Sequence, residues 1–477
     1  MYVKLLLVVC HILFFYYGIL PLINYFRDPK GLRKYPKPSF WSGISNLPLV
    51  IESRKGTRYK RLFEAHKKHP TLRTGPNTLS YADHKAIKDI YGHSTTCTKD
   101  LFYSITSGSH FHLADVIDRS EHPRKRKVLS SAYALKNLES REYKDLTVDY
   151  RMWTNLFTIA AIANIGNDLI TSESMDGTVK RVRFGECHFA NGSATSTLVW
   201  CYDWYQTSVK ASKLFSTTFR RTWKLRRDWD GIVYSRSNNR LKRYLNGEKL
   251  DDFFSAMMAD KNGGPHNLEW GEVIAEVSIM INAGSDTTAI ALANTMLLLL
   301  RNLDCLQKLR EEVDNVMNED EIVAPYDKVK HLPYLRACLD ESMRLHPPVS
   351  FALPRRTPPE GTTILSEFVP GNTSVGISAY VVHRNETIFP DSEAYKPELW
   401  LGEKGKDLQP YFVAFSTGAR GCIGRNISYL EQTVLIASLV HRYEFALPHP
   451  TWEPTPHETT NTGLGAIPIK IWRWGEH

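Results

Sequence analysis

The chain has 477 residues, of which 42% are hydrophobic and 23% charged, and its formal net charge is +9. Lys and Arg are spread along the chain and no nucleic-acid-binding motif accompanies them, so an anionic membrane surface or an acidic partner protein explains the charge better than nucleic acid does. The seven cysteines are odd in number and contain no C-x-x-C, which favours reduced thiols in a cytosol-facing protein over a disulfide framework.

The N-terminal segment predicts a membrane anchor. From Val3 to Tyr25 the residues are almost all apolar or aromatic, and about 20 such residues suffice to cross the hydrocarbon core of a bilayer. A cleaved signal peptide is the alternative, but the run is too long and ends without an A-x-A-like site. Basic residues come after it and place the rest of the chain on the cytosolic side. We therefore expect an N-terminal transmembrane helix in residues 1–26 and one catalytic domain in residues 27–477, since no linker or repeat divides the chain.

The rest of the chain predicts a mainly α fold with a small β region. Residues 71–81 predict two short strands around a Gly-Pro-Asn turn. Most of the chain from there to Leu345 is helix-patterned, and the stretch from about 268 to 300 is apolar enough for a buried central helix. Between residues 361 and 380, Thr, Ile and Val recur with Gly and Pro, which predicts a small sheet.

The most informative stretch runs from Phe415 to Gly424 and reads FSTGARGCIG. It places Cys422 in a glycine-rich loop directly before a helix-like run. Backbone N–H groups and the positive end of a helix stabilise a thiolate, and glycines let the backbone approach a flat cofactor closely. The bland alternative is a buried structural cysteine beside a turn.

This loop matches the pattern F-x-x-G-x-R-x-C-x-G at every defined position, and through it the chain resembles the cytochrome P-450 haem-thiolate monooxygenases. The resemblance implies the cytochrome P-450 fold and haem b with Cys422 as the axial metal ligand. It also implies that Phe415 and Arg420 are cofactor-binding residues. A thiolate ligand pushes electron density onto the iron and favours O–O cleavage.

A second motif, AGSDTT, occupies residues 283–288 inside the predicted central helix. Its glycine and paired threonines weaken a helix interior, Gly by about 1 kcal/mol relative to Ala, so a local requirement is expected. In the family this motif bulges the helix over the haem. The resemblance then implies that Asp286 is a catalytic acid and that the Thr287 hydroxyl holds a proton-donating water. The alternative is a threonine bonded back to its own i−4 carbonyl.

A third set of residues suits the haem carboxylates. His122 and Arg126 lie four residues apart, on one face of a predicted helix. The resemblance assigns both of them, together with Arg420 and Arg355, to the haem propionates, since the guanidinium fork binds carboxylates bidentately. Arg356 would replace Arg355 if the register differed by one residue.

Glu341 and Arg344 form an E-x-x-R pair on one helix face. In the family this pair is structural, and an arginine from a P-x-R-[FW] segment completes it, but this chain has Leu399 at that position. Losing one partner of a buried charge network often costs ~3–5 kcal/mol. We therefore expect His383, Arg384 or an ordered water at the Glu341 side chain.

The resemblance implies a monooxygenase that inserts one oxygen atom from O2 into an apolar small molecule, by hydroxylation or epoxidation. Electrons would come from NADPH through a membrane-bound reductase, at the endoplasmic reticulum membrane. Nucleic acid is not an expected partner. The motifs T-G-P-N at 74–77, V-H-R-N at 382–385 and I-F-P-D at 388–391 resemble those of filamentous-fungal members that oxidise secondary metabolites.

Two alternatives stay open. The first is a haem enzyme of the same fold that needs no dioxygen, an isomerase or dehydratase, against which the Asp286-Thr287 pair argues. The second is a haem-binding protein that is inactive because of Leu399. Segments 97–114 and 168–264 line substrate access in the family, and we expect their aromatic residues to be core more often than substrate contacts. The substrate itself is not predictable from the sequence.

Overall fold

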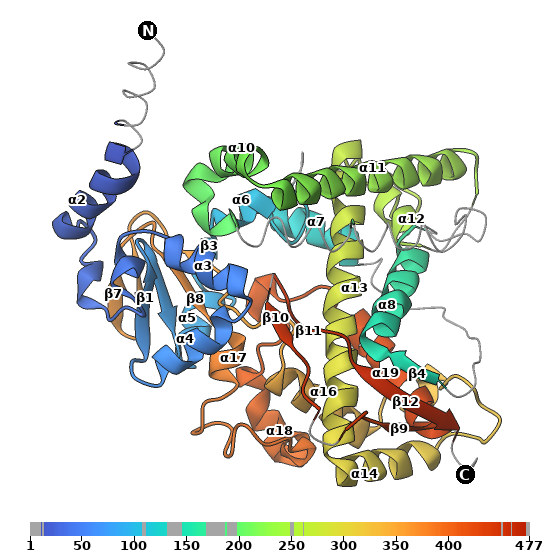
Figure 1. Cartoon of the computed structure of the whole chain (residues 1–477). Helices are drawn as coiled ribbons and strands as arrows, with labels where there is room; N and C mark the ends of the chain where they lie inside the picture. The colour runs from blue at the N-terminus through green and yellow to red at the C-terminus, as the bar shows by residue number, and fades with distance from the viewer. Residues whose placement is uncertain are drawn as a thin grey trace.

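The computed structural model describes residues 11, 14–106, 111–130, 146–167, 187, 198–248, 252–260, 262–449, 452–458 and 460–473. Helices make up most of these residues, and the strands form small sheets, so the predicted mainly α fold with a small β region is confirmed. Figure 1 shows the helical part around one long helix, α13, with a five-stranded sheet and short helices beside it.

The α-helices are α2 (Leu20–Arg27), α3 (Leu47–Lys55), α4 (Arg58–His66), α5 (Ala86–Tyr91), α6 (Phe102–Thr106), α7 (Glu121–Ser130), α8 (Tyr150–Asn167), α10 (Tyr205–Phe215), α11 (Thr217–Leu245), α12 (Phe253–Met258), α13 (Trp270–Arg301), α14 (Leu303–Asp314), α15 (Tyr326–Val329), α16 (Pro333–Leu345), α17 (Ala379–Val382), α18 (Gly402–Leu408) and α19 (Arg425–Arg442). Shorter turns of other helical types are η1 (Phe15–Ile19), η2 (Leu32–Lys34), η3 (Phe40–Gly43), η5 (Val199–Trp204), η6 (Pro397–Trp400), η7 (Gln409–Tyr411) and η8 (Gly418–Arg420). The strands are β1 (Thr71–Gly75), β2 (Thr78–Tyr81), β3 (Thr98–Lys99), β4 (Leu146–Asp149), β5 (Arg355–Arg356), β6 (Thr362–Ile364), β7 (Glu367–Val369), β8 (Ser374–Ile377), β9 (Tyr443–Ala446), β10 (Pro456–Glu458), β11 (Thr462–Leu464) and β12 (Pro468–Arg473).

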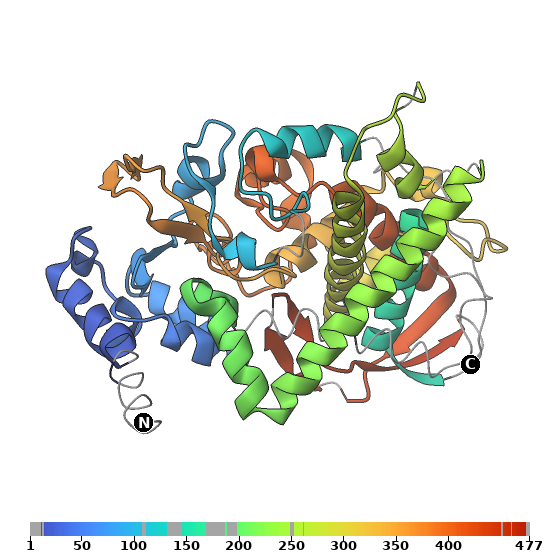
Figure 2. The ribbon, with the colours of Figure 1, turned by 90° about the horizontal axis from the view of Figure 1, so that it is seen from above.

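Helix α13 is the predicted central helix. A reciprocal capping box between Glu269 and Glu272 starts it, and every residue from Thr288 to Leu300 is buried. It packs against α8, α16 and α19, and seen from above α11 crosses it (Figure 2). Long apolar helices of this kind are stable because neighbours cover them on all sides.

The expected bulge in this helix is not present, because the α-helical pattern continues through residues 283–288. The hydroxyls of the motif bond within the helix or to a neighbour instead. Thr287 Oγ1 donates to the Ala283 carbonyl at 2.7 Å, and Thr158 of α8 donates to the Ser285 carbonyl at 2.8 Å. These bonds satisfy the polar groups of the motif without opening the helix.

The five-stranded sheet has the order β1-β2-β8-β5-β3. Strands β1 and β2 form the hairpin predicted around Gly-Pro-Asn, with Thr71 opposite Tyr81. Strand β2 runs parallel to β8, and β5 joins β8 to β3. Strands β6, β7 and β8 all fall within the small sheet region predicted from the sequence. The sheet thus brings Lys99 of β3 opposite Arg355 of β5.

The N-terminal residues that the structure describes, from Phe14 to Arg27, are helical and lie to one side of the helical body (Figure 1). Several of their apolar side chains are exposed, Phe14 at 67% and Phe26 at 63%. Residues 1–10, 12 and 13 of the predicted anchor lie outside the described residues. Within the described part of the chain, only α13 is long and apolar enough to cross a membrane, and 78% of its most apolar window is buried in the protein.

Candidate active site

A cavity of about 330 Å³ lies between α13 and the Cys422 loop. Ala283, Gly284 and Thr287 of α13 line one wall, and the loop from Ala414 to Gly424 supplies much of the opposite wall. Residues from α7 and β5 contribute basic side chains to the same space. The cavity thus collects residues from four distant parts of the sequence.

The Cys422 loop is held by its own backbone and by α5. The Cys422 N–H donates to the Phe415 carbonyl at 2.8 Å. Gly418 has a φ of +69°, and a Cβ there would lie 2.0 Å from the Tyr91 carbonyl oxygen, so no other residue fits. Cys422 lies four residues further on, exposed on the cavity that it lines.

The loop also sets the protonation of the thiol. Although Cys422 is open to the cavity, its enclosure within the protein raises the pKa of the thiol, whereas the backbone N–H groups of Gly424 and Arg425 and the charges of Arg126 and Arg425 act in the opposite direction. The two N–H groups belong to the N-terminus of α19, where the helix dipole favours an anion. The donor set therefore suits a thiolate once a cation, such as a metal, faces it.

The four predicted propionate ligands all line this cavity. His122 and Arg355 are buried, at 5% and 3% exposure. Arg126 donates to the Gly421 carbonyl at 2.9 Å, and Arg420 donates to the Val116 carbonyl at 2.8 Å. Arg356 instead pairs with Asp100 at 3.3 Å and is not among the residues that line the cavity.

These basic groups repel one another, and the charge of one lowers the pKa of another. Burial, and then Arg420, lowers the pKa of His122 to about 3, so this imidazole is neutral. Burial, and then Arg355, lowers the pKa of Arg420 to about 10. Such a concentration of buried cations is costly without anionic partners. A ligand with two carboxylates would supply them.

Sequence reasoning missed Lys99. This lysine is 7% exposed, lines the cavity, and lies with its Nζ 4.9 Å from the centre of the Tyr103 ring. Burial, and then Arg355 and Arg420, lowers its pKa well below the usual value. No local motif marks it, because only the pairing of β3 with β5 places it opposite Arg355.

The structure separates Asp286 from Thr287. Thr287 lines the cavity, whereas Asp286 does not. The Asp286 carboxylate contacts Arg151 of α8 at 2.9 Å and accepts from the Asn461 amide at 2.6 Å. The Thr287 hydroxyl makes the i−4 bond expected from the alternative and also faces the cavity.

Below the Cys422 loop, Glu341 and Arg344 are both fully buried. Arg344 Nε donates to Glu341 Oε2 at 2.7 Å, and Nη2 donates to Oε1 at 2.9 Å. The remaining Arg344 donors reach the carbonyls of His383, Ser392 and Ala394 at 2.8, 2.7 and 3.0 Å. The guanidinium thereby ties α16 to the segment that precedes the cysteine loop.

The expectation of His383 or Arg384 at Glu341 is wrong, whereas the expected water stays a prediction. The indole N–H of Trp400 donates to Glu341 Oε2 at 2.9 Å, and the backbone N–H of Lys396 donates to Oε1 at 2.8 Å. Arg384 pairs with Glu393 instead. The turn η6 brings these two donors to the carboxylate. Trp400, the residue after Leu399, thus takes the acceptor site that the family's arginine would fill.

The aromatic residues of segments 97–114 and 198–205 are mostly core. Phe102, Tyr103 and Tyr205 belong to one buried cluster with Trp223 and Phe351. Tyr103 also lines the cavity, and Arg355 donates to its hydroxyl at 3.2 Å. Residues 168–186 and 188–197 of the predicted access region lie outside the described residues.

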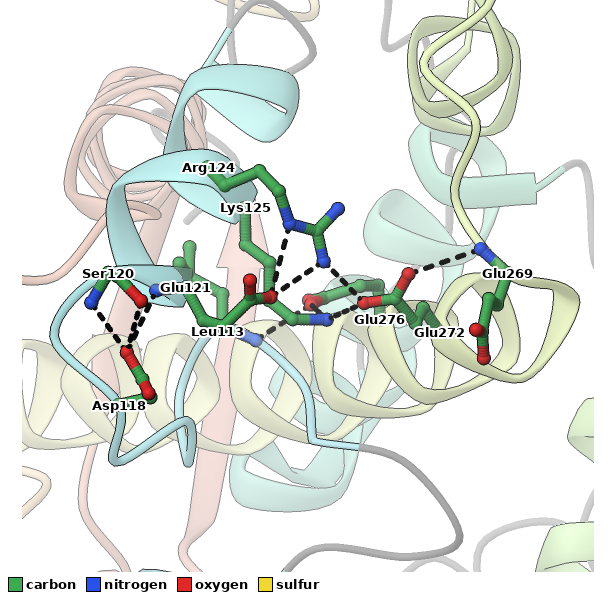
Figure 3. Close-up of polar contacts among 9 residues, drawn as sticks. All are labelled: Leu113, Asp118, Ser120, Glu121, Arg124, Lys125, Glu269, Glu272 and Glu276. Atoms are coloured by element: carbon green, nitrogen blue, oxygen red, sulfur yellow. Dashed lines mark hydrogen bonds and ion pairs between the residues drawn. The ribbon is translucent and has the colours of Figure 1, made fainter.

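A second residue that the sequence did not reveal is Glu276 of α13, which lines the same cavity. It is 2% exposed, and its Oε1 accepts from the Leu113 N–H at 2.7 Å. Figure 3 shows it beside Lys125 and the Leu113 N–H, in a group of charged residues from α7 and α13. In the sequence, a glutamate that a helix points into a cavity looks the same as one that it points to solvent.

The residues present fit an iron porphyrin. One cysteine faces the cavity from a loop in which glycine allows close approach, and several cations gather at the same cavity, among them the buried Arg355 and Lys99. An iron ion satisfies the first requirement and two propionates satisfy the second.

Comparison with known proteins agrees with this chemistry. The sequence profile of the family described as Cytochrome P450 matches residues 36–472. Tryprostatin B 6-hydroxylase of Aspergillus fumigatus is 28% identical over 447 residues, which cover 90% of this chain and 79% of that protein. Benzoate 4-monooxygenase of Aspergillus niger is 28% identical over 480 residues, covering 91% and 92%. A cytochrome P450 monooxygenase of Penicillium oxalicum is 27% identical over 447 residues, covering 87% and 84%.

Proposed function

Since the chain belongs to the cytochrome P450 family and is a monooxygenase of that family, we propose that it inserts one oxygen atom of O2 into an apolar small molecule of secondary metabolism. The observation that carries the proposal is Cys422 on the cavity wall opposite Ala283, Gly284 and Thr287. The names of similar proteins, tryprostatin B 6-hydroxylase among them, support hydroxylation as the reaction.

In this proposal Cys422 holds the haem iron, and His122, Arg126, Arg355 and Arg420 hold its propionates. Bound haem would supply the redox chemistry at this site, with the Cys422 thiolate as its ligand. Buried arginines suit the propionates because each guanidinium offers several donors in one plane. Apolar side chains of the cavity, such as Ile279, Met280, Val349 and Leu353, bind the substrate and exclude water.

Thr287 positions the proton donor. Its hydroxyl proton is committed to the Ala283 carbonyl, so its oxygen accepts a hydrogen bond from a water in the cavity. That water is then oriented to release a proton on the Cys422 side. Asp286, whose carboxylate contacts Arg151 and Asn461 and does not line the cavity, would take a proton from solvent and pass it on to that water.

The same proposal includes a membrane location and a partner. An apolar N-terminal run with exposed Phe14, Phe15 and Tyr16 supports a single-pass anchor in residues 1–26. The catalytic domain would then face the cytosol at the endoplasmic reticulum, where a membrane-bound reductase delivers electrons from NADPH. The net charge of +9 suits both the anionic membrane and an acidic reductase.

The alternative of an inactive haem-binding protein rested on Leu399 replacing the family's arginine. Trp400 and Lys396 donate to the Glu341 acceptor sites that this arginine would otherwise fill, so the alternative loses its basis. The dioxygen-independent alternative gains no support from a cavity that contains Thr287.

The test uses the full chain in membranes with a P450 reductase, NADPH and isotopically labelled O2. Metabolite extracts with and without the gene are compared by mass spectrometry. We expect a product that gains one labelled oxygen and requires both reductase and NADPH. A product formed without labelled oxygen would identify an isomerase or dehydratase, and no product from any extract would contradict the activity.

A further inference from the structure

Glu276 lies on the cavity face of α13. Met280, Ala283 and Thr287 come after it at intervals of three or four residues and line the same cavity, as residues on one helix face do. Eleven residues separate Glu276 from Thr287, which corresponds to ~16 Å along a helix. The carboxylate therefore lies about three helical turns from the Thr287 hydroxyl along α13.

The Glu276 carboxylate is only partly satisfied by the protein. Oε1 accepts from the Leu113 N–H at 2.7 Å, while Oε2 has no hydrogen-bond partner among the described residues. Lys125 Nζ is 3.9 Å from Glu276 Oε1 but 2.6 Å from Glu272 Oε1, so the ammonium bonds to Glu272 (Figure 3). A 2% exposed carboxylate with a vacant oxygen is costly unless something pairs with it.

The neighbouring charges leave this carboxylate without a full counter-ion. Arg124 contacts Glu121 at 2.9 Å and Glu272 at 2.8 Å, and Lys125 contacts Glu272. The group of three carboxylates contains two cations, so one negative charge is left over when all three are ionised. Glu121 and Arg124 are exposed, whereas Glu276 is buried, so the leftover charge belongs to a group that water does not reach.

Of the other charged groups near Glu276, Lys99 lowers its pKa less than Lys125 does. Lys99 is committed to the Ala114 carbonyl and lies against the Tyr103 ring. Burial raises the pKa of Asp115 to about 8, so it is mostly neutral at physiological pH. Burial likewise raises the pKa of Glu276 to about 7, while Lys125 and the Leu113 N–H lower it.

We propose that Glu276 anchors a cationic nitrogen of the substrate, so that the enzyme selects apolar molecules that carry a protonated amine or a quaternary ammonium group. The cation takes the place of the proton at Oε2, and the apolar part of the molecule extends along α13 towards Thr287. The oxidised part of the molecule would then lie about three helical turns from the cationic nitrogen, near Thr287. This inference rests on the proposed monooxygenase function, because it assumes that substrate occupies this cavity.

The test measures binding of two matched probes to the haem-loaded protein. One is a phenylalkyl trimethylammonium, whose nitrogen cannot ligate iron, and the other is the neutral hydrocarbon with a quaternary carbon in its place. Dissociation constants come from the haem spectral shift and from calorimetry. We expect the wild type to prefer the cation by about tenfold or more, and Glu276→Gln to remove this preference without weakening the neutral probe. The control Glu121→Gln, which removes an exposed carboxylate of the same group, should retain the preference.

The wild-type protein also gives a reading that needs no variant. Its preference for the cation should grow as the pH rises through about 7, as Glu276 loses its proton. Equal affinities for the two probes, or a preference that persists in Glu276→Gln, would overturn the inference. A thiolate-type spectrum with carbon monoxide, recorded on the same samples, separates the two proposals: with that spectrum present, only the Glu276 inference fails; without it, the proposed function fails.

Discussion

The indole N–H of Trp400 donates to Oε2 of Glu341 at 2.9 Å, beside the residue where the family has an arginine. With Lys396 N–H and the two bonds from Arg344, each carboxylate oxygen accepts two hydrogen bonds. One carboxylate and one guanidinium also balance in charge. The core below the cysteine loop is therefore complete without a second arginine.

Trp400→Phe should destabilise the protein, because it removes the indole donor and leaves a buried acceptor of Glu341 with an empty site. Such a vacancy costs ~1–3 kcal/mol. The measurement is the midpoint of thermal unfolding together with the rate of haem loss. The control is Trp41→Phe, since Trp41 is 58% exposed and should be nearly neutral. Equal behaviour of the two variants would show that the Trp400 bond contributes nothing.

Leu399→Arg should not stabilise the protein. All four acceptor positions of Glu341 are occupied, so the new guanidinium would have to displace Trp400 or Lys396 N–H. We expect an unchanged or lower unfolding midpoint and unchanged haem retention. A large rise in both would mean that the natural chain tolerates an uncompensated loss.

Thr287→Val should uncouple NADPH oxidation from product formation, because valine keeps the shape of the side chain but removes the hydroxyl that faces the cavity. Haem binding should persist, and the reducing equivalents should appear as peroxide. The matched control is Thr295→Val on the same helix. Thr295 makes the same i−4 bond, to Ala291 at 2.9 Å, and does not line the cavity. If both variants couple as well as the wild type, Thr287 has only a helical role.

Asp115→Asn should stabilise the protein more at high pH than at low pH. Burial raises the pKa of Asp115 from 3.8 to about 8, so the folded state retains a proton that the unfolded state loses. Because the folded state holds this proton more tightly, the Asp115 carboxyl stabilises it. That contribution is complete at pH values below the usual pKa of 3.8 and is lost as the pH rises through about 8. The gap in stability between variant and wild type should widen by ~1–3 kcal/mol from about pH 5.5 to about pH 8.5. A gap that does not change with pH would show that Asp115 is ionised in the folded protein.

Local pattern was enough for the elements that depend on neighbours in sequence. The apolar run of α13 and the Gly-Pro-Asn hairpin of β1 and β2 were predicted from periodicity and turn residues. The glycine-rich spacing around Cys422 likewise revealed a loop whose glycine contacts Tyr91. In each case the signal and the structure occupy the same short segment.

The contacts that the sequence did not reveal join distant segments. Lys99 meets Arg355 only because β3 and β5 pair, and Trp400 reaches Glu341 because η6 folds back on α16. The charge of Glu276 is left unbalanced by pairs formed between α7 and α13. The resemblance to the family also predicted a bulge in α13. The helix is regular there instead, and the Thr287 hydroxyl bonds to the Ala283 carbonyl.

The axial thiolate is the central claim, and the spectrum of the reduced protein with carbon monoxide tests it most directly. We expect the wild type to show the band typical of thiolate-ligated haem. Cys422→Ala should lose that band and turnover together, whereas Cys338→Ala and Cys305→Ala should keep both, since neither of these cysteines lines the cavity. Survival of the thiolate-type band in Cys422→Ala would contradict the assignment.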